Sequence, residues 1–290
     1  MSNFENIKSI LLKVWTLLTL IFTALTSIIQ GTPATSDKIL LINESQYVLD
    51  SAIVAGQGLS ADDEYIYTSG AVSALYLGGL GKIDRSTGEF IQKNIGAIPS
   101  EFTSKGYDHI GGISVYDGKI YAAVEDKAEE TPLVLIYSCE DLSYTGEYYD
   151  MTNDVLDDGI PWLTVDGENG YLYTSTFHNA EEICVYKLAD MSFSHYIILN
   201  EPVDRVQDGV YLDGKLYLNL DPDTDDYTKT VAVIDIASGK VEQKITRPVA
   251  GIKTETEGIY AYKNADGETS LLITDYDKTV SIFMREYVLK

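Results

Sequence analysis

Hydrophobic and polar residues alternate in short runs along most of this chain, and turn residues interrupt the runs about every ten positions. One unit recurs, in which an Asp-Gly turn precedes a Tyr-rich run. Its clearest copies are DGKIYAAVED (117–126), DGENGYLYTSTF (166–177) and DGKLYLNLD (213–221), and looser copies begin at Asp62 and Asp266. A fixed period of about fifty residues indicates a repeat architecture.

Each repeat contains four strand-like runs. In the second repeat they are HIGGISVY, KIYAAVE, LVLIYSC and YTGEYYDM. Four antiparallel strands repeated around an axis form the blade of a β-propeller. Five blades of about 50 residues account for nearly all of the chain after its N-terminal segment. We therefore predict an all-β, five-bladed β-propeller with four antiparallel strands per blade.

The last repeat has three strand-like runs, TEGIYAY, SLLITDY and VSIFMREY, and lacks an outer strand of its own. The run KILLINESQYVL (38–49) precedes the first repeat and belongs to no unit. We predict that residues 38–49 join the last blade as its outer strand, which closes the ring and removes an open sheet edge. A four-bladed ring with a separate N-terminal domain, or a β-sandwich, would not explain five phased repeats.

The N-terminal segment differs in character from the repeats. An uncharged run from Val14 to Ile29 follows Lys8 and Lys13, as in a secretory signal or a membrane anchor. Thr32-Pro33-Ala34 offers a cleavage site, whereas residues 9–30 are long enough to span a bilayer. We expect residues 1–34 to be a signal peptide or a membrane anchor and residues 35–290 to be a single propeller domain. The protein is then extracellular or at the cell surface.

The formal net charge of −24 restricts the classes of partner that the protein is expected to bind. Such a surface repels nucleic acid and anionic lipid, so we expect a small molecule, a cation or a protein as partner, and membrane contact only through the N-terminal segment. The two cysteines, Cys139 and Cys184, fall in third strands of neighbouring blades. We expect two buried free thiols, with a disulfide as the alternative.

Propeller topology sorts the loops into two faces. The connection that enters each blade and the loop between its second and third strands share one face, and compact turns such as Asp117-Gly118 and Asp213-Gly214 lie on the other. Loops on the blade-entry face are long and rich in carboxylates, and they include Glu125-Asp126, Asp157-Asp158 and His178. Binding residues concentrate in loops on a rigid scaffold, so we expect any site on the entry face.

Polar and aromatic residues near the starts of the innermost strands are the candidate ligand-binding set. They are Gln57, Asp108, His109, Trp162, Gln207, Asp208 and Glu257. Asp108 and His109 are also the catalytic candidates, because a histidine beside a carboxylate can act as a general base or a metal ligand. The structural alternative is a hydrogen bond from His109 to a neighbouring blade. Trp162 is either an aromatic wall for a ligand or part of the packing between blades.

Two sets of carboxylates suggest Ca²⁺. Asp221, Asp223 and Asp225 have the alternating spacing of a calcium loop, although the positions where an EF-hand has Gly and Glu are Asp226 and Ala232. The second set, Asp108, Asp208 and Glu257, would meet at the channel mouth from three blades. A solvated acidic loop is the alternative for residues 221–226.

The first repeat resembles a known family. GQGLSADDEYIYTSG followed by GKIDRSTGEFIQK is similar to the opening blade of the plant-type glutaminyl cyclotransferases, in which a Phe-Thr-Gln-Gly-Leu motif precedes a Glu-Ser-Thr-Gly motif. Gln57-Gly58-Leu59 matches the first motif, and Tyr67 stands where the family has its channel glutamate. The resemblance implies a five-bladed propeller.

The sequence has no nucleophile elbow, phosphate-binding glycine run or zinc-type Cys/His cluster. Our leading hypothesis is therefore an exported or membrane-tethered binding module that presents its acidic face and channel mouth to a cation, a polar small molecule or a protein segment. The alternative is an enzyme of the glutaminyl cyclotransferase-like or metal-dependent hydrolase type with its site in the channel mouth. A third hypothesis, a structural spacer, predicts a featureless entry face.

Overall fold

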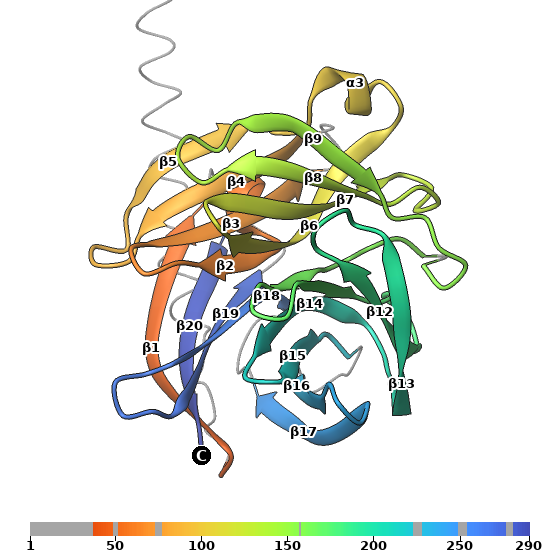
Figure 1. Cartoon of the computed structure of the whole chain (residues 1–290). Helices are drawn as coiled ribbons and strands as arrows, with labels where there is room; N and C mark the ends of the chain where they lie inside the picture. The colour runs from red at the N-terminus through yellow and green to blue at the C-terminus, as the bar shows by residue number, and fades with distance from the viewer. Residues whose placement is uncertain are drawn as a thin grey trace, which may run out of the picture.

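Five four-stranded antiparallel sheets are arranged around a common axis in the computed structural model (Figure 1). The structure describes residues 37–48, 52–72, 77–156, 158–222, 228–248, 254–276 and 281–290. Each sheet is one blade, with its strands in chain order from the axis outward, apart from the outer strand of the last blade. The predicted all-β, five-bladed β-propeller is confirmed.

The first four blades each follow one sequence repeat. Blade 1 has β2 (Leu59–Ala61), β3 (Tyr65–Val72), β4 (Leu77–Asp84) and β5 (Phe90–Ile95), and blade 2 has β6 (Tyr107–Tyr116), β7 (Lys119–Asp126), β8 (Leu133–Ser138) and β9 (Tyr144–Asp150). Blade 3 has β10 (Thr164–Asp166), β11 (Tyr171–Thr174), β12 (Ala180–Lys187) and β13 (Phe193–Val203). Blade 4 has β14 (Val206–Leu212), β15 (Lys215–Leu220), β16 (Thr228–Asp235) and β17 (Lys240–Pro248). Two short helices, α2 (Ala52–Ala55) and α3 (Ser100–Thr103), lie in connections.

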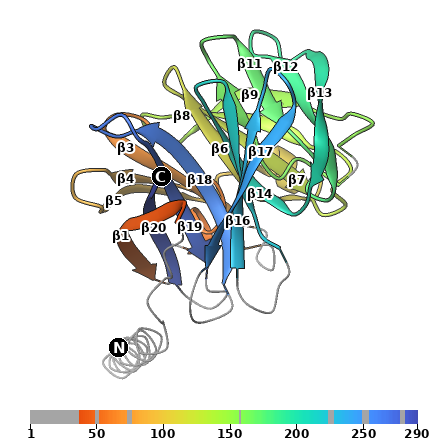
Figure 2. The same ribbon diagram turned by 90° about the horizontal axis from the view of Figure 1, so that it is seen from below.

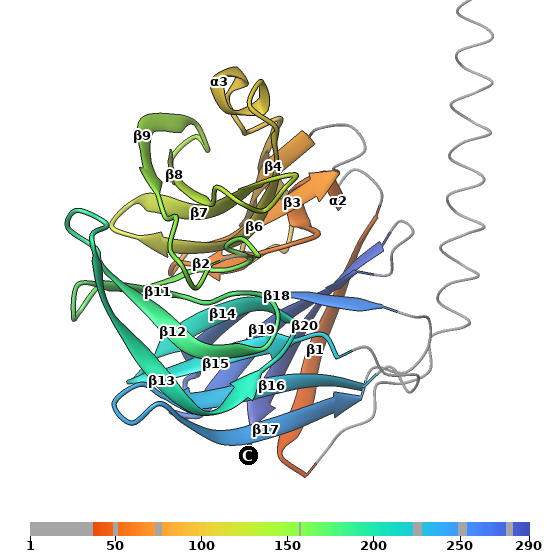
Figure 3. The ribbon, with the colours of Figure 1, turned by 90° about the vertical axis from the view of Figure 1, so that its right-hand side faces the viewer.

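The fifth blade joins the two ends of the described chain. It contains β18 (Glu255–Lys263), β19 (Thr269–Tyr276) and β20 (Ser281–Leu289), and its outer strand is β1 (Ile39–Val48). β1 pairs antiparallel with β20 from Ile39 opposite Leu289 to Val48 opposite Ser281, and Figures 2 and 3 show the two strands side by side. The predicted closure by residues 38–49 is therefore confirmed.

Tight hairpins between the first and second strands explain the Asp-Gly motif. In blade 2 the turn residues Asp117 and Gly118 have φ of 49° and 71°, and in blade 4 Asp213 and Gly214 have φ of 51° and 75°. Two consecutive residues with positive φ form the turn whose twist matches antiparallel strands, and Asp and Gly tolerate that conformation better than other residues.

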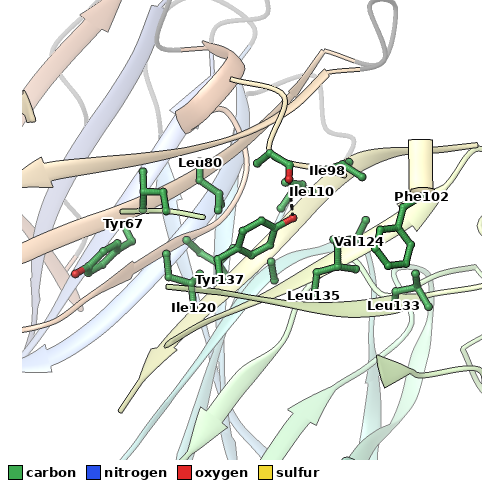
Figure 4. Close-up of a cluster of buried hydrophobic side chains, with 14 of the residues drawn as sticks. Tyr67, Leu80, Ile98, Phe102, Ile110, Ile120, Val124, Leu133, Leu135 and Tyr137 are labelled. Carbon is green, nitrogen blue, oxygen red and sulfur yellow. Dashed lines mark hydrogen bonds between the residues drawn. The ribbon is translucent and has the colours of Figure 1, made fainter. Parts of the chain in front are cut away.

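Hydrophobic clusters fill the interfaces between neighbouring blades. The described residues form five such clusters, each combining residues of two adjacent blades. Between blades 1 and 2, Tyr67 and Leu80 face Ile110, Val124 and their neighbours (Figure 4). The Tyr137 hydroxyl in this cluster donates a hydrogen bond of 3.4 Å to the backbone oxygen of Ala97. Tyr67, from the Tyr-rich second strand of the first repeat, is thus a packing residue.

Hydroxyl groups link three successive blade interfaces near the axis. A Ser or Thr on one inner strand accepts a hydrogen bond from a backbone N–H on the next inner strand. The pairs, each at 3.0 Å, are Ser60 with Val115, Ser114 with Val165, and Thr164 with Tyr211. Blades 1 to 4 are therefore joined by one repeated polar contact.

Glycines allow the innermost strands to meet at the axis. A Cβ on Gly112 would lie 2.4 Å from Oδ1 of Asp208 and 2.8 Å from Cα of Trp162. A Cβ on Gly58 would lie 2.6 Å from Cα of Gly112. These separations are too short for any larger residue, so the inner strands pack backbone to backbone beneath the blade-entry face.

A buried ionic network, which we call the closure cluster, joins blade 4 to the closing blade. Asp275 of β19 accepts two hydrogen bonds from Arg247 of β17, at 2.7 and 2.8 Å, and one from Arg285 of β20 at 2.5 Å. Arg285 also pairs with Glu44 of β1 at 2.6 Å. Burial alone would raise the pKa of Asp275, but the charges of Arg247 and Arg285 outweigh it and hold that pKa well below its usual range.

The remaining predictions about the chain have separate outcomes. Cys139 and Cys184 are both free and buried. The predicted signal peptide or anchor, residues 1–34, lies outside the described residues. Within the residues that the structure describes, no helix has both the length and the apolar character needed to cross a membrane.

Candidate functional site: an acidic cavity on the blade-entry face

A cavity of ≈ 320 Å³ opens on the blade-entry face, above the point where the inner strands meet. Every blade contributes to its wall. The lining residues are Gln57, His109, Glu125, Glu129, Asp158, Pro161, Phe177, His178, Gln207, Glu255 and Glu257. We call it the entry-face cavity.

Two kinds of segment supply most of these side chains. One kind is the start of an innermost strand or the residues just before it, which place Gln57, His109 and Gln207 around the axis. The other is the loop between the second and third strands of blades 2 and 3, which places Glu129 and Phe177 at the rim. Both lie on the face where propeller topology predicts a site.

His109 is held between two other cavity residues. Its Nδ1 lies 2.9 Å from Oε2 of Glu125, and its Nε2 lies 3.0 Å from Oε1 of Gln57. The His109 side chain is 28% exposed, whereas that of Glu125 is 7% exposed. Burial alone would lower the pKa of His109, but the hydrogen bond and the charge of Glu125 outweigh it and raise that pKa.

Local strand geometry explains why His109 pairs with Glu125. β6 and β7 are in register at His109 and Glu125, and the register shifts between Tyr107 and His109. Such an irregularity re-aims the side chains next to it. Asp108 and His109, adjacent in sequence, therefore have different surroundings.

Carboxylates crowd one side of the cavity. Partial desolvation raises the pKa of the Glu129 side chain, which remains exposed, and the charges of Glu125 and Asp158 raise it further. Asp158 also fixes the loop after β11, because its two oxygens accept hydrogen bonds from the backbone N–H groups of Phe177 at 3.0 Å and His178 at 2.9 Å. The loop carrying the aromatic residue Phe177 is thus held by a carboxylate of the cavity itself.

The charge of the lining is unbalanced. It includes five carboxylates, those of Glu125, Glu129, Asp158, Glu255 and Glu257, and two histidines. No Lys or Arg occurs among the described residues that line the cavity. A concave surface with one sign of charge attracts ligands of the opposite sign.

The seven ligand-binding candidates divide into two groups. Gln57, His109, Gln207 and Glu257 line the cavity together. Asp108, Trp162 and Asp208 are buried and do not line it.

Asp108 and Trp162 are both buried outside the cavity. Asp108 is 3% exposed, and its Oδ2 has no hydrogen-bond partner. Trp162 is fully buried against Gly209 and donates a hydrogen bond of 2.9 Å to Oγ of Ser175. Its environment matches the inter-blade packing alternative.

Asp208 joins three innermost strands at the axis. Its carboxyl oxygens accept backbone N–H groups of Leu59 in blade 1 at 3.2 Å, Ile259 in blade 5 at 3.0 Å and Gly209 at 2.9 Å. Burial raises the pKa of Asp208 well above its usual range, and these three hydrogen bonds lower it only in part. Asp208 therefore connects blades beneath the cavity.

The two expected calcium sets have different surroundings. Asp221 pairs with the side chains of Lys229 and Arg205, the latter at 3.2 Å, so two cations already neutralise its carboxylate. Asp223 and Asp225 lie outside the described residues. Over the part of the chain that the structure describes, no group of three or more His, Cys, Asp or Glu side chains could hold a metal ion, so Asp108, Asp208 and Glu257 are not brought together as a metal site.

The candidate set from the sequence left out several lining residues, including Glu125, Glu129 and Asp158. Topology placed Glu125, Asp158 and His178 on the face where the cavity opens, but nothing in the sequence indicates that Glu125 pairs with His109. That contact depends on the register shift in β6.

The chain is similar to known proteins in fold and not in sequence. No protein-family model matches the chain, and no curated protein matches it in sequence. Among solved structures, it is similar to the tail fiber of Staphylococcus aureus phage P68, at 16% identity and a TM-score of 0.51, covering 90% of this chain and 52% of that one. It is also similar to Kuenenia stuttgartiensis hydrazine synthase, at 14% identity and a TM-score of 0.43, covering 85% and 59%.

A third similar structure is the Dos1 propeller, at 12% identity and a TM-score of 0.42, covering 79% of this chain and 67% of that one. The chain thus spans between about half and two thirds of these proteins. Likeness at this level of identity concerns the fold alone. The resemblance to glutaminyl cyclotransferases is supported as far as the five-bladed architecture, and membership of that family is not confirmed.

Proposed function

We propose that this protein is a β-propeller binding module whose entry-face cavity takes a small organic cation, or the cationic side chain of a protein segment. The observation that carries the proposal is the composition of the cavity wall, with five carboxylates and no Lys or Arg among its described residues. Because negative charges are crowded there, entry of a cation lowers the electrostatic free energy, while entry of an anion raises it.

The size and shape of the cavity favour a molecule over a bare metal ion. A volume of ≈ 320 Å³ is at the small end of the range for ligand pockets. The wall also includes Phe177 and Pro161, which provide apolar contact area for a carbon chain. An amine or guanidinium on a short aliphatic chain would therefore use both the carboxylates and the apolar side.

The place of action rests on the sequence alone. The predicted signal or anchor in residues 1–34 leads us to propose that the domain binds its ligand outside the cytoplasm, and the strong negative charge favours a cationic ligand there as well.

Isothermal titration calorimetry with agmatine, a guanidinium and an ammonium on a four-carbon chain, tests the proposal. We expect saturable binding to the full-length chain at about pH 7, and no binding of the neutral analogue butylurea. The double variant Glu125→Gln/Glu129→Gln should bind agmatine at least tenfold more weakly.

The matched control is Glu64→Gln/Glu140→Gln, which removes the same charge from the opposite face, where both residues border a separate groove. Equal loss of affinity in the two double variants would show that net charge, and not the cavity, governs binding.

A catalytic role is the second candidate, and one observation favours it. A histidine oriented by a carboxylate and facing a cavity, as His109 is by Glu125, is the usual arrangement of a general base. The test is hydrolysis or cyclisation of N-terminal glutamine peptides and esters by the full-length chain. Rates that are the same in His109→Ala as in the unmodified protein would remove this candidate.

A further inference from the structure

His109 sits between two hydrogen-bond acceptors. Nδ1 faces the carboxylate oxygen Oε2 of Glu125, and Nε2 faces the amide oxygen Oε1 of Gln57. Neither oxygen can donate a proton to the ring: an ionised carboxylate has none, and an amide oxygen carries none. With the Gln57 amide oxygen turned toward the ring, both ring nitrogens donate, which only the doubly protonated imidazolium can do.

The surroundings of His109 contain negative charge from several blades. The negative charges of Glu125 on β7, of Glu129 in the following loop and of the neighbouring Asp108 on β6 act on the ring from its own blade. The other ionisable groups around the cavity are Asp158 and His178 of blade 3 and Glu255 and Glu257 of blade 5. Carboxylates thus outnumber basic groups on the described elements that pack against the cavity.

A cation already occupies part of the cavity in this arrangement. The imidazolium of His109 donates a hydrogen bond to the carboxylate of Glu125, and it lies among the carboxylates that would attract a ligand cation. Two cations inside one cavity repel each other, so a bound cationic ligand disfavours the charged form of the His109 ring. Loss of the proton from Nε2 leaves a neutral ring whose Nδ1 still donates to Glu125.

We propose that His109 is the resident cation of the entry-face cavity, and that an organic cation binds in exchange for the proton on Nε2 of His109. The inference rests on the proposed function, because it names how the same site is regulated. Ligand binding then releases about one proton to the buffer, and cation affinity increases as the pH rises through the titration of His109. In an acidic compartment the protein would release its ligand.

The ligand-free protein gives the first test, which does not depend on knowing the ligand. The chain has three histidines, His109, His178 and His195, so NMR titration of the full-length protein can follow each ring, with His109→Gln as the assignment control. We expect the His109 ring to be doubly protonated up to a pH above the ordinary histidine pKa of about 6.5. A neutral ring at lower pH, with Nε2 accepting a hydrogen bond from the Gln57 amide, would overturn the proposal.

Calorimetry of agmatine binding in buffers of different ionisation enthalpy gives the second test. The slope of the observed enthalpy against the buffer enthalpy measures the number of protons released. We expect close to one proton for the unmodified protein at about one pH unit below the midpoint of the His109 titration, where most His109 rings are doubly protonated. We expect close to none for His109→Gln, and an unchanged value for His195→Gln, whose ring lies on the outer strand β13.

The outcomes separate the two proposals. If agmatine binds without proton release, or if His109→Gln releases as many protons as the unmodified protein, the exchange is wrong while the binding function stands. If no organic cation binds although NMR finds the imidazolium, the proposed function is wrong and the exchange fails with it.

Discussion

The closure cluster and the entry-face cavity both gather ionisable side chains from distant parts of the chain, but they differ in charge balance and in access to solvent. In the closure cluster, Arg247 and Arg285 balance Asp275 and Glu44, and three of the four side chains are at most 3% exposed. In the entry-face cavity, five carboxylates face two histidines around an open space of ≈ 320 Å³.

This difference separates a structural role from a binding role. Charges that are buried and paired with one another hold neighbouring blades in place and are closed to a ligand. Charges of one sign that line an open cavity raise each other's energy, and a ligand of opposite charge relieves that repulsion. The pKa of Glu129 is raised first by desolvation and in addition by the charges of Glu125 and Asp158. A buried charge network alone is therefore weak evidence for a functional site.

The largest expected effect concerns the closure cluster. Asp275→Ala leaves Arg247 and Arg285 buried without their shared partner, so we expect the free energy of unfolding to fall by about 3–5 kcal/mol in urea denaturation. Glu44→Ala is the matched control, because its side chain is 36% exposed and should cost about 1 kcal/mol or less. Similar losses in both variants would contradict the distinction between the buried Asp275 and the more exposed Glu44.

The pH dependence of the same cluster has a defined sign. The pKa of Asp275 is lower in the folded protein than in the unfolded chain, so its contribution to stability is present above the unfolded pKa and is lost as the pH falls through the folded pKa. The difference in unfolding free energy between the unmodified protein and Asp275→Ala should stay constant from neutral pH to about pH 4 and shrink only below it. If this free-energy difference began to decrease near neutral pH, a group other than Asp275 would be responsible for the titration.

Asp208 provides a test of the inner strands beneath the entry-face cavity. Replacing it by Ala leaves the backbone N–H groups of Leu59, Ile259 and Gly209 without their acceptor, and we expect a loss of about 2–4 kcal/mol in urea denaturation.

The folded pKa of Asp208 is raised, so the stabilisation it provides is complete below the unfolded pKa and declines as the pH rises toward the folded pKa. The cost of Asp208→Ala should therefore be greater at acidic pH than at neutral pH. The opposite trend would show that Asp208 is ionised in the folded protein and acts as a fixed negative charge beneath the cavity.

A smaller effect is expected for a single carboxylate of the cavity. Glu129→Gln removes one of five negative charges at an exposed position, so agmatine affinity should fall about three- to tenfold, with little change in the free energy of unfolding. A decrease in stability without a decrease in affinity would place Glu129 with the structural charges instead.

The smallest effect belongs to the repeated hydroxyl contacts between blades. Ser114→Ala removes the acceptor for the backbone N–H of Val165 and should lower the free energy of unfolding by about 1 kcal/mol. Agmatine affinity should not change, because Ser114 is not among the residues that line the cavity. A large loss of affinity would mean that the alignment of blades 2 and 3 controls the site.

The fold could be predicted from the sequence because its determinants are local and repeated. Alternation of apolar residues, Asp-Gly turns with positive φ and a constant period define each blade without knowledge of distant contacts. The closing strand could also be predicted, since residues 38–49 had the pattern of a strand and only the last blade lacked one.

The candidate site could be predicted only in part. The cavity opens on the face that topology indicated, and four of the seven candidates line it. The sequence did not indicate whether Asp108 or His109 faces the cavity, because the register shift between Tyr107 and His109 is not encoded in any local pattern. It also did not distinguish Glu257, which lines the cavity, from Asp208, whose oxygens are taken by backbone groups of two other blades.

The central claim is that the entry-face cavity is a cation site, and titration of the full-length protein with agmatine tests it most directly. At about pH 7 and low salt we predict saturable binding to one site per chain, no binding of the neutral butylurea, and weaker binding by at least tenfold in Glu125→Gln/Glu129→Gln. Equal affinity for agmatine in the folded double variant, or tighter binding of butylurea than of agmatine, would contradict the account.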